Sequence, residues 1–449
     1  DSDASAARSI HAYDSVDGGN NSNWFFNGTG GTTVTWEGDE SGDWNVPGNW
    51  DAGRTPMDLD DVVIPGTGGS NPSVPPCTFV YNSLDVQSGR TVTCRGDTSA
   101  ANQASGGTPN NPHGVGVTFI LKTDAAIAGL LNANAQGFTG YRGPGRASQY
   151  QGACHGGWGG GNPARRRLAY GSDTQPTALG SGGCPLWGTV NGGGAIKIEA
   201  GGTVNITGTV RANGQGGVGT HGSHDSAGAS GGSVWIVCDT FTGTGTIQAR
   251  GGTGTDTSGS GAGGRIALDW TAANTFTGTI RLEGGSESTW YREGYPGTLS
   301  IPDGESLTVR YDTALSAGTH SFSALTVTNS AILQLQSDFS TWYGSGVTIN
   351  ADTVTIDAGA RLSAKGMGYG HWFKGPGARN MGGGHGGYGG VGRSGGTRGP
   401  AYGNAVEPQE LGSSGYSDAG GVLKLNVAGT LTVNGTIDCD DTSTYHGIR

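Results

Sequence analysis

Three closely spaced aspartates, Asp58, Asp60 and Asp61, are the first candidates for metal chemistry in this chain of 449 residues. Carboxylate oxygens are the ligands that calcium prefers, so the cluster predicts a Ca²⁺ site. Its spacing differs from that of an EF-hand loop, and no lysine stands near it that could serve as the base of a polysaccharide lyase. We expect no other cofactor.

Paired carboxylates are what a glycoside hydrolase would need, held about 5–10 Å apart. The adjacent pairs Asp60–Asp61 and Asp440–Asp441 do not offer this arrangement, because neighbouring side chains of a strand point to opposite faces. Metalloprotease and phosphate-loop motifs are also missing from the sequence. We therefore name no catalytic residue and favour a protein without enzymatic activity. A polysaccharide lyase or glycoside hydrolase on a β-helix scaffold is the alternative.

Aromatic side chains in glycine-rich stretches could stack on sugar rings, because they present flat apolar faces. The candidates are Trp158, Trp187, Trp372 and Tyr388. The same side chains could instead anchor the glycine-rich stretches to the body of the protein. We favour this structural role.

Two histidines, His155 and His385, occupy matching places in a His-Gly-Gly-(Trp/Tyr)-Gly-Gly motif. A lone histidine without an adjacent carboxylate is a weak indication of a metal site. We expect both side chains to hold their loops through hydrogen bonds to backbone carbonyl groups.

Six cysteines are consistent with an oxidising compartment, and no Cys-x-x-Cys pair indicates zinc or redox chemistry. The first two flank strand-like runs, and the next two lie within one glycine-rich stretch. The predicted disulfides are Cys77 with Cys94, Cys154 with Cys184 and, as the remaining pair, Cys238 with Cys439.

An internal duplication reveals the elements that must position these residues. The stretches 141–210 and 373–437 carry the same landmarks in the same order, in a chain with 91 glycines. Each begins near a Gly-Pro-Gly, continues through the histidine motif and a Leu-Gly-Ser block, and ends in an alternating apolar run. A duplicated unit usually specifies an architecture, whereas a catalytic site is needed only once.

A shorter element recurs four times and predicts strands. Two glycines precede an alternating apolar run, and Gly-Thr with a β-branched residue follows 14 or 15 residues after the first glycine. The copies begin at Gly193, Gly231, Gly263 and Gly420. Such short runs are poor cores alone and predict stacked coils. We therefore expect an all-β, right-handed parallel β-helix or solenoid with long glycine-rich loop insertions and an N-terminal cap. A β-propeller-like array is the alternative.

The glycine-rich insertions, residues 137–192 and 366–420, allow two interpretations. Glycine in two of every three positions can form extended left-handed strands packed side by side, because residues without Cβ allow close approach. The insertions could equally be long irregular loops with glycine at the turns.

We divide the chain into four parts, beginning with a tryptophan-rich cap, since a stack of strands must cover its first rung. The parts are residues 1–112 as N-terminal segment and β cap, 113–285 as first glycine-rich repeat, 286–360 as connecting rungs and 361–449 as second, incomplete repeat.

Net charge, hydropathy and the first residues of the sequence limit the classes of partner and the cellular compartment that we expect. The net charge of −11 disfavours nucleic acid, and no apolar run of 18 residues predicts a membrane span. The sequence starts at Asp1 without an initiator methionine or signal segment, which predicts a processed, secreted protein. Four Asn-x-Ser/Thr sequons, which would matter in a eukaryotic secretory route, stand at Asn20, Asn27, Asn205 and Asn434.

The histidine-glycine motif, the Leu-Gly-Ser block and the run 193–210 resemble a glycine-rich repeat of large secreted and cell-surface proteins. The stretch 36–65 is similar to the entry module of bacterial surface β-helix proteins. The resemblance covers most of residues 36–437 and implies an extracellular structural or adhesive β-helix without assigned catalytic residues. We expect a filament subunit or a segment of a larger surface protein that associates end to end and contacts polysaccharide. A non-catalytic glycan-binding module is a further alternative.

Overall fold

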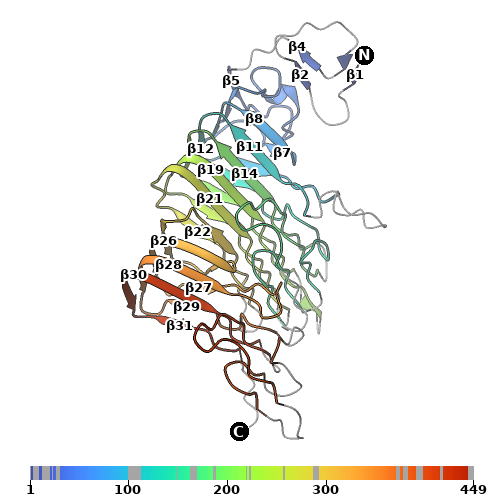
Figure 1. Ribbon diagram of the computed structural model, residues 1–449. Coiled ribbons are helices and arrows are strands. Elements are labelled where there is room, and N and C mark those ends of the chain that lie inside the picture. Colours follow the sequence, from blue (N-terminus) through green and yellow to red (C-terminus); the bar gives the residue numbers. More distant parts are fainter. Residues whose placement is uncertain are drawn as a thin grey trace.

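The structure, a computed structural model, is an elongated stack of short strands that run across its long axis (Figure 1). A short 3-10 helix, η1 (Pro47–Asn49), accompanies the strands, and no helix of the described residues is long and apolar enough to cross a membrane. The described residues are 2–3, 10–12, 21–22, 24–26, 31–99, 113–148, 150–161, 169–185, 189–218, 220–221, 224–255, 258–286, 293–370, 375–377, 383–390, 398–414 and 418–442.

One sheet of 15 parallel strands runs through the whole stack. Its main path contains β5 (Thr33–Thr35), β6 (Asp61–Ile64), β9 (Ser83–Val86), β12 (Ala125–Ile127), β15 (Thr203–Ile206), β19 (Ser233–Thr242), β21 (Arg265–Asn274), β23 (Thr298–Ser300), β25 (Thr313–Leu315), β27 (Ile332–Leu335), β29 (Arg361–Ser363) and β31 (Thr436–Asp438). The strands β8 (Thr78–Tyr81), β11 (Val117–Leu121) and β14 (Ala195–Ala200) join it beside this path.

Two further parallel sheets follow each other along the stack. The first has six strands, β7 (Ser73–Val74), β10 (Thr91–Cys94), β13 (Leu130–Asn132), β16 (Thr209–Arg211), β20 (Thr246–Gln248) and β22 (Thr279–Arg281). The second has four, β24 (Glu305–Val309), β26 (Gly318–Val327), β28 (Val347–Ile356) and β30 (Leu423–Val433).

Three two-stranded sheets complete the described strands: β1 (Ser2–Asp3) with β3 (Asn21–Ser22), β2 (Ile10–Ala12) with β4 (Trp24–Phe26), and β17 (Thr220–His221) with β18 (His224–Asp225). Only the last of these pairs of strands is antiparallel. The alternative of a β-propeller-like array is therefore wrong, because propeller blades are antiparallel.

Sequence alternation explains both the strands and their register. In β14, Ile196 and Ile198 face the core and Lys197 lies between them at the surface. Parallel pairing aligns Ile196 with Val234 of β19, and Val234 with Ile266 of β21. Equivalent positions of successive rungs thus form a continuous apolar ladder. Because each fully buried aliphatic side chain contributes roughly 1.5–3 kcal/mol, the ladder stabilises neighbouring rungs together.

Three tryptophans fill the core beside the first rungs. Trp36, Trp44 and Trp50 are each 1% exposed, and the ring of Trp44 packs edge-on against Trp50 at 4.7 Å. Their indole N–H groups donate to oxygen atoms, for example Trp50 Nε1 to Trp44 O at 3.0 Å. Buried tryptophans need such partners, so the cluster combines apolar packing with satisfied polar groups.

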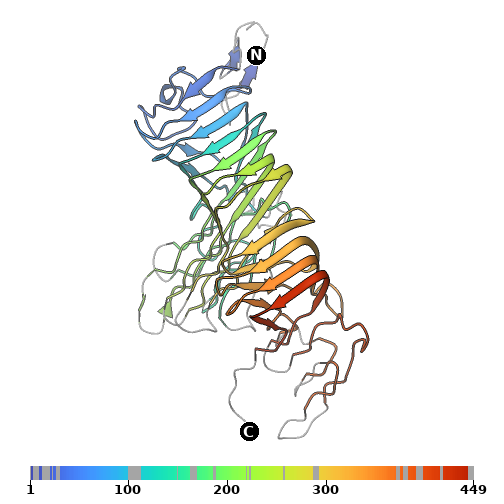
Figure 2. The same ribbon diagram turned by 90° about the vertical axis from the view of Figure 1, so that its left-hand side faces the viewer.

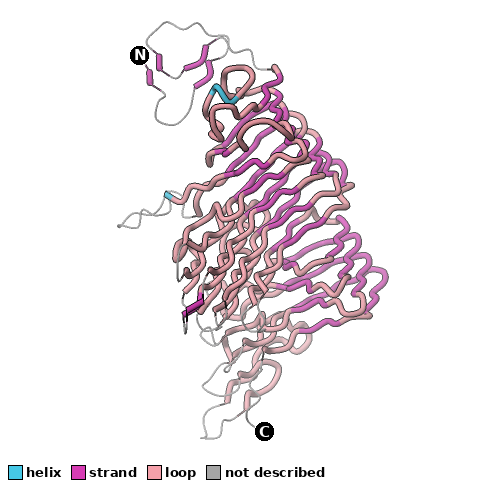
Figure 3. Tube along the Cα trace, turned by 180° about the vertical axis from the view of Figure 1, so that it is seen from behind, coloured by secondary structure: helices cyan, strands magenta, loops and turns pink. Residues whose placement is uncertain are grey.

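The glycine-rich segments form a layer of their own beside the strands (Figures 2 and 3). The segment 226–232 illustrates how they pack, since it makes backbone hydrogen bonds to several other segments. Gly193 N donates to Ser230 O at 3.0 Å, and Gly231 N donates to Ala262 O at 2.9 Å. A strand in a sheet bonds to at most two neighbouring strands, whereas this segment bonds to more than two others. Such packing requires close approach of the backbones, which glycine permits because it has no Cβ.

The four predicted strand repeats are confirmed in β14–β16, β19–β20, β21–β22 and β30–β31. The four-part division of the chain stays a prediction. Its parts share the 15-stranded sheet, so the apolar core passes through them without interruption.

Candidate functional site

The two glycine-rich modules, defined as residues 130–214 and 361–441, contain the same hydrogen-bond network in their described parts. In the first module, Tyr170 Oη donates to Leu179 O at 2.6 Å. Gly145 N donates to Ser181 Oγ at 2.9 Å, and Tyr170 N donates to His155 O at 3.1 Å. These bonds connect the histidine motif to the Leu-Gly-Ser block.

The second module repeats these bonds one for one. Tyr402 Oη donates to Leu411 O, Gly377 N donates to Ser413 Oγ at 2.8 Å, and Tyr402 N donates to His385 O at 2.7 Å. The duplication in the sequence is therefore a duplication of backbone packing. Differences between the modules identify where a function could reside.

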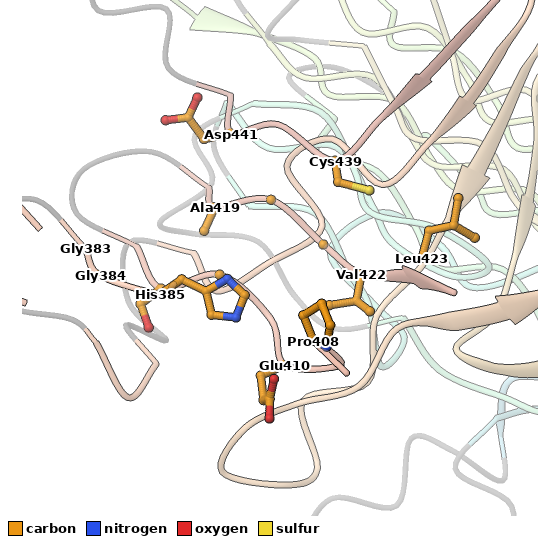
Figure 4. A pocket seen from close by; sticks show the side chains of 14 residues that line it. Gly383, Gly384, His385, Pro408, Glu410, Ala419, Val422, Leu423, Cys439 and Asp441 are labelled. Carbon is orange, nitrogen blue, oxygen red and sulfur yellow. The ribbon is translucent and has the colours of Figure 1, made fainter. Parts of the chain in front are cut away.

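The main difference is an open pocket of about 650 Å³ in the second module (Figure 4). The histidine motif, the Leu-Gly-Ser block and the start of β30 contribute to its walls. The lining residues are Gly383, Gly384, His385, Pro408, Glu410, Gly412, Ser413, Ala419, Gly420, Gly421, Val422, Leu423, Cys439 and Asp441.

The matching histidine of the first module lies in a closed environment. His155 is 0% exposed, and its Nδ1 lies 2.8 Å from Gly231 O. A carbonyl oxygen can only accept, so Nδ1 carries the proton of a neutral ring. Burial, helped by the Arg265 guanidinium, lowers the pKa of His155 to about 3. The expectation that this histidine binds a backbone carbonyl is confirmed.

Two ionisable side chains of the open pocket, Cys439 and Glu410, have shifted pKa values. Burial raises the pKa of Cys439, assisted by the Asp438 and Asp440 carboxylates, so its thiol stays protonated at neutral pH. Weak burial raises the pKa of Glu410, but hydrogen bonds, chiefly from the backbone N–H of Asn404, bring it below its usual value. The Cys439 thiol is therefore not an activated nucleophile.

The predicted calcium ligands have other partners. Asp60 is fully buried and accepts from Arg54 Nη1 at 2.6 Å and from Met57 N at 2.8 Å. Asp61 accepts from Asn82 Nδ2 at 2.7 Å and from Ser83.

The hydrogen bonds of Asp60 and Asp61 leave the predicted calcium site without direct support. Within the described ranges, no three His, Cys, Asp or Glu side chains gather closely enough to hold a metal ion. A calcium site at Asp58, Asp60 and Asp61 stays a prediction. Asp60 ties the loop before β6 to Arg54, an ion pair that local sequence reasoning missed.

The structure places the candidate aromatic residues in different environments. Trp158 is partly buried and packs against Tyr295, with ring centres 5.6 Å apart, and against Phe339. Tyr388, its counterpart in the second module, is 74% exposed. Trp187 and Trp372 lie outside the described residues. Trp158 is therefore an anchor, whereas Tyr388 is accessible to a ligand.

None of the six cysteines forms a disulfide in the structure. The predicted pair Cys238–Cys439 is wrong, because six strand steps of about 4.8 Å separate β19 from β31 and a disulfide needs Cα atoms within about 7 Å. Cys94 is buried in the core and forms no disulfide with Cys77 in the structure.

The predicted pair Cys154–Cys184 is likewise not formed in the structure. Cys154 Sγ accepts from Gly159 N at 3.2 Å, and Cys184 Sγ donates to Tyr141 Oη at 3.0 Å. Each thiol thus has its own partner within the glycine-rich layer.

No family model, curated protein or solved structure matches the chain. The resemblance to secreted glycine-rich repeats stays a prediction from the sequence.

Proposed function

We propose that the protein is an extracellular structural or adhesive element built as a right-handed parallel β-helix. In this proposal the tryptophan cluster caps the first rung, and molecules associate end to end. The observation that supports the proposal most directly is the repeated module. The same hydrogen bonds recur around Ser181 and Ser413, so the chain devotes two long segments to one packing unit.

The end of the stack supports association between molecules. On β30 and β31, Leu431, Val433 and Ile437 are 47%, 44% and 37% exposed. Exposed apolar strands at the edge of a sheet are templates for pairing with another chain. A structural element that assembles through its ends would use such an edge.

Electron microscopy of the purified protein, combined with its mass in solution, tests the proposal. We expect rods that join into fibres with an axial repeat of one molecule. The double variant Leu431→Lys/Val433→Lys should abolish the fibres and leave the monomer folded, since both side chains already contact solvent. Wild-type rods that stay monomeric at all accessible concentrations would refute the end-to-end assembly.

Glycan binding is a second candidate function, favoured by the exposure of Tyr388. An accessible ring on a glycine-rich loop could stack on a sugar. Binding of the wild type and of Tyr388→Ala to a glycan array would test it. Equal glycan binding by both proteins, or no binding by either, would remove this candidate.

A further inference from the structure

The open pocket of the second module has a filled counterpart in the first. We propose that the pocket binds an extended, glycine-led β-strand, in the way that the first module binds residues 229–237 of its own chain. This inference deepens the proposed structural role and rests on it. The partner has a defined chemistry: two consecutive glycines followed by alternating apolar residues.

Residues 230 and 231 enter the first module through polar contacts with three of its groups. Ser230 N donates to Ser181 O at 3.1 Å, and Ser230 O accepts from Gly193 N at 3.0 Å. Gly231 O lies 2.8 Å from His155 Nδ1. The strand thereby closes the site over the histidine.

The next two residues continue the contact along the backbone. Gly232 N donates to Ala212 O at 2.7 Å, and Ser233 N donates to Gly194 O at 2.9 Å. From Ser233 onward the segment is β19, which pairs in parallel with β14. The docked segment therefore begins in the glycine-rich layer and ends as a strand of the main sheet.

The groups named above that hold residues 230–233 in the first module have equivalents on the wall of the open pocket. Sequence alignment of the two modules places His385 at His155, Ser413 at Ser181, Gly420 and Gly421 at Gly193 and Gly194, and Cys439 at Ala212. In the part of the chain that the structure describes, the carbonyl oxygens of Gly421 and Cys439 accept no backbone hydrogen bond. Two acceptors that bind the strand in the first module thus have equivalents in the pocket that receive no backbone donor among the described residues.

Apolar exposure gives a second, independent indication. Val204, Ile206 and Val210 of the first module are 0% exposed, since β19 and β20 cover their strands. Their equivalents Leu431, Val433 and Ile437 are the exposed residues at the end of the stack. A strand docked on β30 would cover them as β19 covers β15.

The space around Gly231 and Gly232 in the first module shows which glycine a docked strand needs. A Cβ on Gly232 would lie 1.8 Å from Gly194 O, within the module that receives the strand. A Cβ on Gly231 would instead meet Ala249 O at 2.3 Å, which belongs to a later rung. Only the second glycine is therefore required for docking of a single strand.

A lysine of the first module makes one further contact with the docked strand, and this contact favours an aromatic side chain in the partner. Lys197 Nζ lies 3.9 Å from the ring centre of Trp235, which faces it from β19. Lys424 occupies the equivalent position on β30 and could form the same cation–π contact.

Peptide binding to the full protein tests the inference. The probe is a fluorescently labelled peptide with the sequence of residues 226–237, and its anisotropy reports binding. Two matched peptides carry Gly231→Ala or Gly232→Ala. We expect the wild-type and Gly231→Ala peptides to bind within about threefold of each other, and the Gly232→Ala peptide to bind at least tenfold more weakly.

A protein variant provides the complementary test. A Cβ on Gly412 would lie 3.0 Å from its nearest neighbour, Gly420 O, whereas on the equivalent Gly180 it would lie 2.4 Å from Gly231 O of the docked strand. Gly412→Ala should thus leave the protein folded and weaken peptide binding at least tenfold. Gly390→Ala, with no atom within 4 Å of the added Cβ, is the control that should bind as the wild type does.

Absence of binding, or equal binding of all three peptides, would overturn the inference. Fibres formed by a protein that binds no peptide would sink the strand-docking inference and leave the proposed structural role intact. Peptide binding by a protein that never forms fibres would support the strand-docking inference and refute the proposed end-to-end assembly.

Discussion

Replacement of the two matched histidines should have very different consequences. His155 is fully buried beneath residues 230–232, with Nδ1 2.8 Å from Gly231 O, whereas His385 is half-buried in the open pocket. The substitutions His155→Ala and His385→Ala remove the same atoms from the same motif. Any difference between them therefore reports the strand that covers only the first module.

Two contributions set the loss of stability that we expect for His155→Ala. Loss of the ring leaves Gly231 O buried without its partner, which costs about 1–3 kcal/mol. The vacated space beside Tyr170, whose ring centre lies 4.6 Å from that of the histidine, adds roughly 2–3 kcal/mol for a large-to-small change. Nε2 of His155 is buried without a hydrogen-bond partner among the described residues, so its removal returns part of this cost. We expect a net loss of about 3–5 kcal/mol, against about 1 kcal/mol or less for His385→Ala.

Native-state hydrogen exchange of the amides of residues 230–237 is the suitable assay, because opening of one rung need not unfold the whole stack. A loss of about 4 kcal/mol corresponds to exchange that is roughly a thousandfold faster. Exchange at β28 serves as an internal reference. Similar acceleration in both variants, or none in His155→Ala, would refute the closed and open environments inferred for the two modules.

Three further predictions concern other parts of the molecule. Burial raises the pKa of Asp60, but hydrogen bonds from Arg54 and from backbone N–H groups outweigh this effect and hold the pKa below the usual 3.8. The stabilisation is therefore present above pH 3.8 and is lost as pH falls through the lower folded value. Asp60→Asn should therefore destabilise the protein by about 2–4 kcal/mol at pH 7 and progressively less below pH 3.8, measured by denaturant titration at several pH values. Because His155 stays neutral down to about pH 3 while the unfolded chain takes up a proton near pH 6.5, wild-type stability should decline as pH falls between these values, and His155→Ala should lack this component of the decline. Trp158→Ala should lower stability by about 2–4 kcal/mol through lost packing, whereas Tyr388→Ala should change it by less than about 0.5 kcal/mol in the same titration; equal effects would contradict the anchoring role of Trp158.

Local pattern was sufficient for the strands and for the duplication. The alternation of Ile196 and Ile198, and of Leu423 and Leu425, predicted β14 and β30 because a strand buries every second side chain. Periodicity of this kind is a property of consecutive residues, so it can be read without knowing what lies opposite. The same holds for the order of landmarks in the two modules.

Partners that lie far apart in the sequence were beyond such reasoning. Three closely spaced carboxylates indicated calcium, yet Asp61 binds Asn82, a residue of the next rung. The pair Cys238–Cys439, chosen by elimination, failed for a similar reason, since the two residues belong to rungs at a distance that no disulfide spans. Contact between groups depends on the register of the stack, which the spacing of residues along the chain does not give.

The open pocket shows most clearly which features depend on the sequence alone and which depend on the tertiary structure. The sequence by itself determined that two modules exist and that His385 matches His155. Only the tertiary structure decided that residues 230–237 cover one module and leave the other with an exposed edge at β30. The physical reason is that parallel stacking connects each rung to the one that follows, so identical modules acquire different environments according to what is stacked on them.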